Sequence, residues 1–331
     1  MKRVLLLIVL LIISIYPLAA QNQALKVVAT TTIVADVAKN IGGDLVTVTS
    51  LVPPDADAHA FEPTPQDALA VSQADVVLAV GVQYEAFLSG LEENAARTDV
   101  VNISDGITIY PFVLEEGAEI NGQVDVNVAP LGVLGKDNIC GDHPAATESP
   151  AALAGCDPHV WTDPQNGKIW ADNIAAAFAA QDPTHADTYK ANAEAYKMQL
   201  QTADDDIRQI LSVVPEDRRV LVTNHEFMSY FARAYDFKLV GVVVPGGTTG
   251  GETDPQAVAG LINLIKTAGV PAIFAETSAN TQMIDSIAGD ASVQVVSTLS
   301  ESLTAAGGVA DTYIGYLKYN AQTIADALKG T

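Results

Sequence analysis

Short apolar runs alternate along this chain with longer segments whose apolar residues recur at helical spacing, and this alternation limits the possible folds more than any other feature. Strands that alternate with helices are typical of a parallel sheet covered by helices on both faces. The pattern predicts strands at residues 26–31, 46–51, 75–80, 100–103, 219–223, 238–244, 272–275 and 293–297. It predicts helices at 33–41, from 64 onward, 167–180, 183–214, 225–235, 255–268, 282–288 and 309–328. The expected fold class is therefore α/β, with mainly parallel sheets.

One predicted helix is longer than the others and divides the pattern in two. Over residues 183–214 apolar and aromatic side chains recur at steps of three and four, and Pro215 ends the helix. About thirty helical residues span roughly 45 Å at 1.5 Å per residue, enough to run along a two-lobed molecule. We therefore expect an N-terminal lobe over 25–182, a connecting helix over 183–214 and a C-terminal lobe over 215–331. A simple surface helix is the alternative.

Residues 1–20 have the composition of a secretory signal peptide. Lys2 and Arg3 precede an apolar run over residues 5–15, and small residues end the segment at Ala20. The run is short for a membrane span, which needs about 20 apolar residues, so cleavage after Ala20 is favoured over a retained anchor. No cysteine follows the run, so we expect no lipid anchor. The mature protein is expected to be exported to the periplasm or extracytoplasmic space and to be soluble there.

The net charge of −23 narrows the class of partners. Such an acidic chain is not expected to bind nucleic acid or an anionic membrane surface. The charge would raise the local concentration of cations only weakly, because salt screens it, and solubility explains it equally well. The length is sufficient for two lobes with cores of their own, and we expect a monomer.

The only two cysteines fall near the end of a segment, about 113–156, in which the strand and helix pattern fails. We interpret this segment as a long insertion in the N-terminal lobe. A pair in an oxidising compartment predicts a Cys140–Cys156 disulfide. The alternative is a local zinc chelate, because His143 and His159 each follow a cysteine at the spacing C-x2-H. Thiolates would need a reducing compartment to persist there.

Three of the five histidines lie in distinctive segments: His59 in DAHAFEPT, His159 in DPHVWTDP and His225 in TNHEF. Any one of them alone is more readily explained as an ordinary surface or hydrogen-bonded histidine. Neutral imidazoles, however, bind Zn²⁺, and three of them with one further ligand make a tetrahedral site. His59 and His225 each follow a predicted parallel strand, where ligand sites of α/β sheets gather. The three residues come from both lobes, so they predict a site in the cleft between the lobes.

These segments carry a resemblance to a known family. The chain resembles the zinc/manganese class of ABC-transporter solute-binding proteins, which includes metal-binding lipoproteins once called adhesins. The similar stretches are residues 52–67, 157–164, 221–237, 273–278 and 299–303. The resemblance covers nearly all of the mature chain. It implies two (β/α) lobes joined by one long rigid helix, with a divalent metal ion held between them and a membrane permease as the partner.

The resemblance also implies a set of metal ligands. The first two family ligands fall on His59 and His159, and the third, which is His or Glu in this family, falls on His225. The fourth is commonly Asp in a short Ser-Asp-small segment, and here the matching segment places Glu301 at that position. Glu is one methylene longer than Asp, so the aim of this carboxylate is open. Glu276 is an alternative fourth ligand, or an acceptor for a ring N–H of a metal-bound histidine.

Ligand chemistry favours Zn²⁺ as the transported ion. Three imidazoles and one carboxylate suit Zn²⁺ better than Mn²⁺, which prefers more oxygen donors, and Mn²⁺ remains the alternative. The long His-rich loop of some zinc members is missing. A zinc-dependent hydrolase with Glu226 or Glu301 as general base is a second alternative, but a carboxylate in the fourth position would leave no room for substrate. A metal-stabilised adhesin is the third. We expect a binding protein and not an enzyme.

Overall fold

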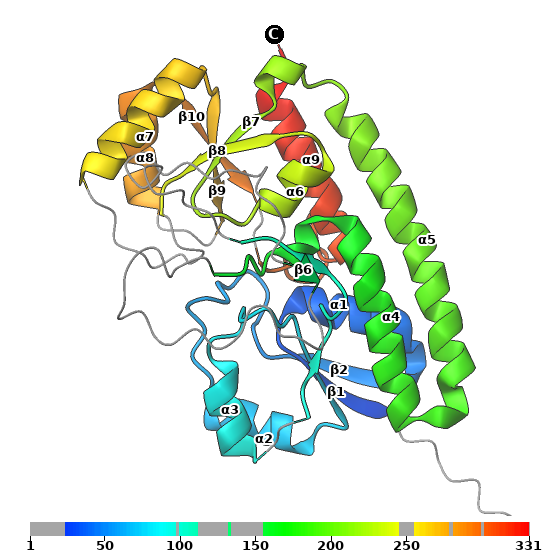
Figure 1. Cartoon of the computed structure of the whole chain (residues 1–331). Coiled ribbons are helices and arrows are strands. Elements are labelled where there is room, and N and C mark those ends of the chain that lie inside the picture. The colour runs from blue at the N-terminus through cyan, green and yellow to red at the C-terminus, as the bar shows by residue number, and fades with distance from the viewer. Residues whose placement is uncertain are drawn as a thin grey trace, which may run out of the picture.

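Two parallel sheets, one in each half of the chain, form the centre of the fold (Figure 1). In this computed structural model their strand orders are β2-β1-β3-β4 and β10-β9-β7-β8. The strands are β1 (Leu25–Ala29), β2 (Val46–Ser50), β3 (Val76–Ala79), β4 (Val101–Asn102), β7 (Val220–Thr223), β8 (Lys238–Val242), β9 (Ala272–Glu276) and β10 (Gln294–Thr298). The structure describes residues 24–96, 99–111, 132–133, 155–244, 255–277, 281–298 and 301–330. The predicted α/β class with two parallel-sheet lobes is confirmed.

Helices follow the strands in the order expected for such sheets. They are α1 (Thr32–Gly42), α2 (Pro65–Gln73), α3 (Leu88–Ala95), α4 (Pro164–Gln181), α5 (Ala186–Leu211), α6 (Ser229–Ala234), α7 (Pro255–Ala268), α8 (Thr281–Ala291) and α9 (Tyr313–Leu328). Short 3₁₀ turns lie at η1 (Gly43–Leu45), η3 (Val160–Thr162), η4 (Pro183–His185) and η5 (Glu216–Arg218). A small antiparallel pair joins β5 (Thr108–Ile109) to β6 (Gly132–Val133). Among the described helices, none is both long and apolar enough to cross a membrane.

The long helix α5 links the two lobes and lies along the side of both (Figure 1). It has 26 residues, roughly 39 Å of helix at 1.5 Å per residue. It is shorter than predicted because the first three residues of the predicted range 183–214 form the 3₁₀ turn η4 and the last three lie beyond its end at Leu211. It packs against α4 of the N-terminal lobe and α9 of the C-terminal lobe.

A buried carboxylate ties α5 to both lobes. One oxygen of Asp204, Oδ1, accepts a hydrogen bond from Tyr235 Oη at 2.9 Å. The other oxygen, Oδ2, accepts one from Gln165 Nε2 of α4, also at 2.9 Å. Because Asp204 is only 4% exposed, both bonds are shielded from water. The lobes are therefore fixed to the connecting helix by specific polar contacts as well as by apolar packing.

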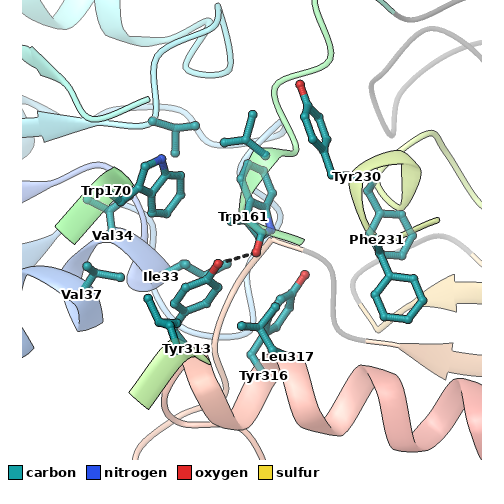
Figure 2. Packing of buried hydrophobic residues seen from close by; sticks show 14 of the residues in the cluster. Ile33, Val34, Val37, Trp161, Trp170, Tyr230, Phe231, Tyr313, Tyr316 and Leu317 are labelled. Carbon is teal, nitrogen blue, oxygen red and sulfur yellow. Dashed lines mark hydrogen bonds between the residues drawn. The ribbon is translucent and has the colours of Figure 1, made fainter. Parts of the chain in front are cut away.

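The N-terminus of α9 inserts an aromatic side chain into the N-terminal lobe (Figure 2). The Tyr313 ring stacks on Trp170 with 6.3 Å between ring centroids, and its hydroxyl donates to the Trp161 carbonyl oxygen at 2.6 Å. A Cβ on Gly167 would lie 2.8 Å from this ring, so α4 can approach Tyr313 this closely only with glycine there. Asp36 of α1 accepts a hydrogen bond from the Tyr313 N–H at 3.0 Å. This interlobe packing holds the segment that carries His159.

Two predicted helices begin later in the structure than expected, and one helix was not predicted. The helix expected over 225–235 is wrong in its first turn: α6 begins at Ser229. The His225 carbonyl instead accepts hydrogen bonds from Thr223 Oγ1 at 2.5 Å and from the Phe227 N–H at 3.0 Å. The helix expected from 309 begins at Tyr313, because the Thr312 side chain caps it there. Helix α3 was not predicted.

Several sequence predictions fall outside the described residues. The signal peptide over 1–20 and Cys140 lie outside them, as does most of the insertion over about 113–156. Two parts of that insertion are described: β6, and the end of the segment near Cys156. Cys156 is buried and forms an isolated antiparallel bridge with Pro111.

Candidate metal-binding site

Four side chains from four separate segments meet between the lobes. They belong to His59, His159, His225 and Glu301, and one potential ligand atom of each lies within 4.8 Å of the other three. His159, His225 and Glu301 are buried, and the His59 side chain is 10% exposed. The residues singled out from the sequence are thus the ones that the fold brings together.

His59 lies on the loop between β2 and α2. Its backbone N–H donates to Asp57 Oδ1 at 2.9 Å, which makes a tight local turn. The loop ends at a capping box in which Thr64 and Asp67 exchange hydrogen bonds and Pro65 opens α2. On the ring, Nε2 lies 2.7 Å from Glu301 Oε1. Both ends of this loop are therefore held while the imidazole faces the carboxylate.

His159 caps the 3₁₀ turn η3 just before α4. One oxygen of Asp157, Oδ1, lies 2.9 Å from the His159 backbone N and 2.9 Å from its ring Nδ1. A carboxylate at Nδ1 keeps the proton there and leaves the Nε2 lone pair for a metal. Asp157 is held in turn from α6, because Ser229 Oγ donates to its Oδ2 and Tyr230 Oη donates to its backbone carbonyl at 2.9 Å. The C-terminal lobe thus helps to orient His159 of the N-terminal lobe.

His225 follows β7 directly and is completely buried. Its Nδ1 lies 3.3 Å from Glu276 Oε2, and the same oxygen accepts a hydrogen bond from Asn224 Nδ2 at 2.7 Å. Its Nε2 lies 3.2 Å from His159 Nε2. Asn224 Nδ2 also lies 3.1 Å from His225 Nδ1, so Glu276 and Asn224 both lie behind the ring, and Glu276 is not among the four clustered side chains. This is the second of the two roles that the sequence left open for Glu276.

Glu301 closes the cluster from the segment after β10. Its Oε1 lies 2.7, 3.2 and 3.4 Å from Nε2 of His59, His159 and His225. A tetrahedral metal with ligands at about 2.0–2.2 Å requires ligand atoms roughly 3.3 Å apart. The His159, His225 and Glu301 atoms have this spacing, at 3.2–3.4 Å from one another, whereas His59 Nε2 lies closer than this to Glu301 Oε1. The other oxygen, Oε2, is buried and accepts no hydrogen bond from the described residues.

The charges of the site favour an ionised carboxylate surrounded by imidazoles. Burial would raise the pKa of Glu301, but the charge of His59 and the histidine hydrogen bonds hold it well below its usual range. Burial would lower the pKa of His159, but hydrogen bonds to Asp157 and Glu301 raise it overall. Burial likewise opposes the charge of His225, yet Glu276 and Glu301 hold its pKa well above the usual value. Protons and a metal cation therefore compete for the same ring nitrogens.

Aromatic rings close the site on the side of the N-terminal lobe. Tyr84 lies edge-on to His59 with 5.4 Å between ring centroids, and Trp161 lies 5.2 Å from His159. Tyr84 is buried, and burial together with the charge of Glu301 raises its pKa well above the usual value. The phenol therefore stays protonated and neutral. Such walls exclude water and strengthen the electrostatic interactions of the site.

Apart from Glu276, sequence reasoning missed the residues that orient the clustered histidines. A signal for two of them exists: both His59 and His159 have an aspartate two positions earlier, and in both cases that aspartate accepts the histidine N–H. The roles of Asn224 and Ser229 depend on contacts between distant segments and leave no such local signal. Of the remaining histidines, His185 pairs with Asp182 at 2.5 Å in η4, and His143 lies outside the described residues.

Comparisons with known proteins agree with this geometry. Residues 27–327 match the family model described as zinc-uptake complex component A, periplasmic. The chain is 30% identical over 308 residues to the manganese-binding lipoprotein MntA of Halalkalibacterium halodurans, a match that covers 93% of this chain and 89% of that protein. It is 28% identical over 317 residues to the iron ABC transporter substrate-binding lipoprotein MtsA of Streptococcus pyogenes serotype M1, with 93% and 90% covered.

A solved structure is also similar over nearly the whole chain. The periplasmic zinc-binding protein TroA from Treponema pallidum superposes with a TM-score of 0.74 at 25% identity, and the match covers 93% of this chain and 100% of that one. The names of these similar proteins mention manganese, iron and zinc. They agree on metal binding, the family model and MtsA add uptake or transport, and together they do not select one metal.

Proposed function

The chain belongs to the zinc-uptake component A family, and from that premise we propose that its cargo is Zn²⁺, bound by His59, His159, His225 and Glu301. Proteins of this family are solute-binding components of metal ABC importers and not enzymes. They bind a metal ion and work with a membrane permease. We propose that this protein does so outside the cytoplasm, after removal of residues 1–20.

The observation that carries the choice of metal is the set of donor atoms. Three imidazole nitrogens and one carboxylate oxygen lie within 4.8 Å of one another, and this donor set suits Zn²⁺. Two of the rings, His159 and His225, have a carboxylate at Nδ1, which leaves Nε2 free to bind. The carboxylates of Asp157 and Glu276 also balance part of the charge that a dication brings into a buried site.

One observation favours Mn²⁺ as the second candidate. The Oε2 atom of Glu301 is buried and accepts no hydrogen bond from the described residues, so Glu301 has a second oxygen to offer. A carboxylate that binds through both oxygens would add the further oxygen donor that Mn²⁺ prefers. The choice between the metals therefore depends on whether Glu301 binds through one oxygen or two.

Metal analysis of the exported protein tests the proposal. We expect one Zn²⁺ per chain, retained in competition with Mn²⁺, and an intact mass that shows the loss of residues 1–20. Alanine at His59, His159 or His225 should weaken Zn²⁺ binding by more than the roughly 10–100-fold that loss of an outer hydrogen-bond partner costs a metal site.

The chain supplies its own matched controls. Alanine at His185, which pairs with Asp182 in η4, and alanine at His143 should leave Zn²⁺ binding close to that of the parent. Equal losses for all five histidine substitutions would show that the site is not where we place it.

We also propose a Cys140–Cys156 disulfide that restrains the segment leading into the site. In support, the Asp157 N–H donates to the Tyr110 carbonyl at 2.8 Å, so the backbone beside Cys156 is already fixed. In the chain-entropy model a closed loop of about 15 residues constrains the unfolded state by about 3 kcal/mol. Thiol titration of the denatured, unreduced protein should detect no free thiol. Two thiols that are protected only while zinc is present would support the local C-x2-H chelate instead.

A further inference from the structure

The segment that follows Glu301 is attached to the opposite lobe from the one that its sequence position indicates. Residues 302–305 come after β10, the edge strand of the C-terminal sheet. The Ser302 hydroxyl, the Leu303 N–H and the Ala305 N–H nevertheless donate hydrogen bonds to residues of the N-terminal lobe. If only its place after β10 determined its motion, Glu301 would move with His225, which follows β7 of the same sheet.

This segment is hydrogen-bonded to two places in the N-terminal lobe. At the start of α1, Thr32 Oγ1 accepts a hydrogen bond from the Leu303 N–H at 2.9 Å and lies 3.4 Å from Ser302 Oγ. On the loop that carries His59, the Pro53 carbonyl accepts a bond from Ser302 Oγ at 3.2 Å, and the Asp55 N–H donates to the Leu303 carbonyl at 3.1 Å.

Three of the residues that make these contacts are buried. Thr32, Ser302 and Leu303 are 8%, 7% and 3% exposed. A buried N–H that loses its acceptor bears the full desolvation penalty, so the Leu303 N–H strongly favours the arrangement in which Thr32 accepts from it. At Asp55 the backbone is left-handed, with φ at 59°, a conformation that is uncommon outside glycine and that its surroundings must hold.

We infer that Thr32 is a positioning residue for the metal, because its hydroxyl holds the Glu301 segment on the N-terminal lobe through the hydrogen bond from the Leu303 N–H. Glu301 and His59 then form one unit, and metal release requires this hydrogen bond to break. The inference rests on the proposed function. Its physical reason is that Glu301 Oε1 lies closest to His59 Nε2, at 2.7 Å, and both residues are within four positions of backbone that the Thr32 and Pro53–Asp55 contacts fix. The His225 side of the site would then separate first when the lobes part.

The test compares Zn²⁺ release from the parent protein and from Thr32→Val, measured with a chelator in excess. Valine keeps the shape of threonine but leaves the Leu303 N–H without an acceptor. We expect release to be at least tenfold faster. Thr32→Ser restores the hydroxyl and should return the rate to within about threefold of the parent, which a merely structural loss would not do.

Ser104→Ala is the matched control, because it also removes a buried hydroxyl, one that accepts from Trp170 Nε1 at 3.0 Å and makes no contact with the Glu301 segment. It should lower the melting temperature of the metal-free protein and leave Zn²⁺ release unchanged. The inference would be overturned if Thr32→Val released Zn²⁺ at the rate of the parent, or if Ser104→Ala released it as fast as Thr32→Val. If Thr32→Val does not fold, Ser302→Ala is measured in its place, because it loses the contacts to Pro53 and Thr32. Zn²⁺ release from Ser302→Ala at the rate of the parent would overturn the inference. A parent that binds no Zn²⁺ would instead overturn the proposed function.

Discussion

Glu301 is the residue on which the chemistry of the site depends most. One of its oxygens lies within 3.4 Å of three ring nitrogens, and its pKa is held well below the usual range by His59 and the histidine hydrogen bonds, against the effect of burial. It therefore offers a full negative charge to an arriving cation. A family position that is commonly Asp is here filled by a longer side chain whose reach is sufficient.

Glu301→Gln should lower Zn²⁺ affinity by at least about a hundredfold, because a neutral amide replaces the only charged ligand while the size of the side chain is kept. Glu301→Asp should keep most of the affinity and change the ratio of zinc to manganese binding. Isothermal titration with each metal measures both effects. If Glu301→Gln binds Zn²⁺ as tightly as the parent, Glu301 is not a ligand.

At the same scale, the sequence indicated the clustered side chains better than the residues that hold them. His59, His159 and His225 could be found because each lies in a distinctive segment and two of them follow a strand. Asn224 and Ser229 could not, because Asn224 holds Glu276 of another strand and Ser229 holds Asp157 of the other lobe. Such contacts arise only when distant segments have folded together.

At the scale of elements, strands and long helices were predictable and short helix starts were not. The apolar spacing of α5 identified the connecting helix, although its ends differ by three residues at each side from the range 183–214. Helix α6 begins late because the Thr223 hydroxyl and the Phe227 N–H both bind the His225 carbonyl, which a regular helix would need for its own ladder. Local side-chain bonds of this kind compete with helix formation. The hydrogen bonds that hold His225 in place therefore interrupt the regular start of this helix.

At the scale of the whole molecule, the site joins the two lobes through charge as well as through packing. His159 belongs to one lobe and His225 to the other, and their Nε2 atoms lie 3.2 Å apart. Without metal, the carboxylate of Glu301 lies between rings whose pKa values are raised. A proton shared between Glu301 and these rings offsets part of the negative charge of Glu301 between the lobes, as a metal ion would. The same lobes are therefore held together by different cations at different pH.

This exchange predicts how zinc and pH act together on stability. The pKa values of His159 and His225 are raised in the folded protein, so the metal-free protein binds more protons when folded than when unfolded. That contribution is fully present below the unfolded value of about 6.5 and is lost as pH rises through the folded values. Zinc requires neutral rings, so its affinity rises over the same range. The gain in melting temperature on adding Zn²⁺ should therefore grow from pH 6 to pH 8, as thermal unfolding with and without metal would show. His185→Ala, which removes an imidazole that lies in η4 away from the site, should leave this growth unchanged. A gain that is the same at every pH would mean that protons and zinc do not compete for these two rings.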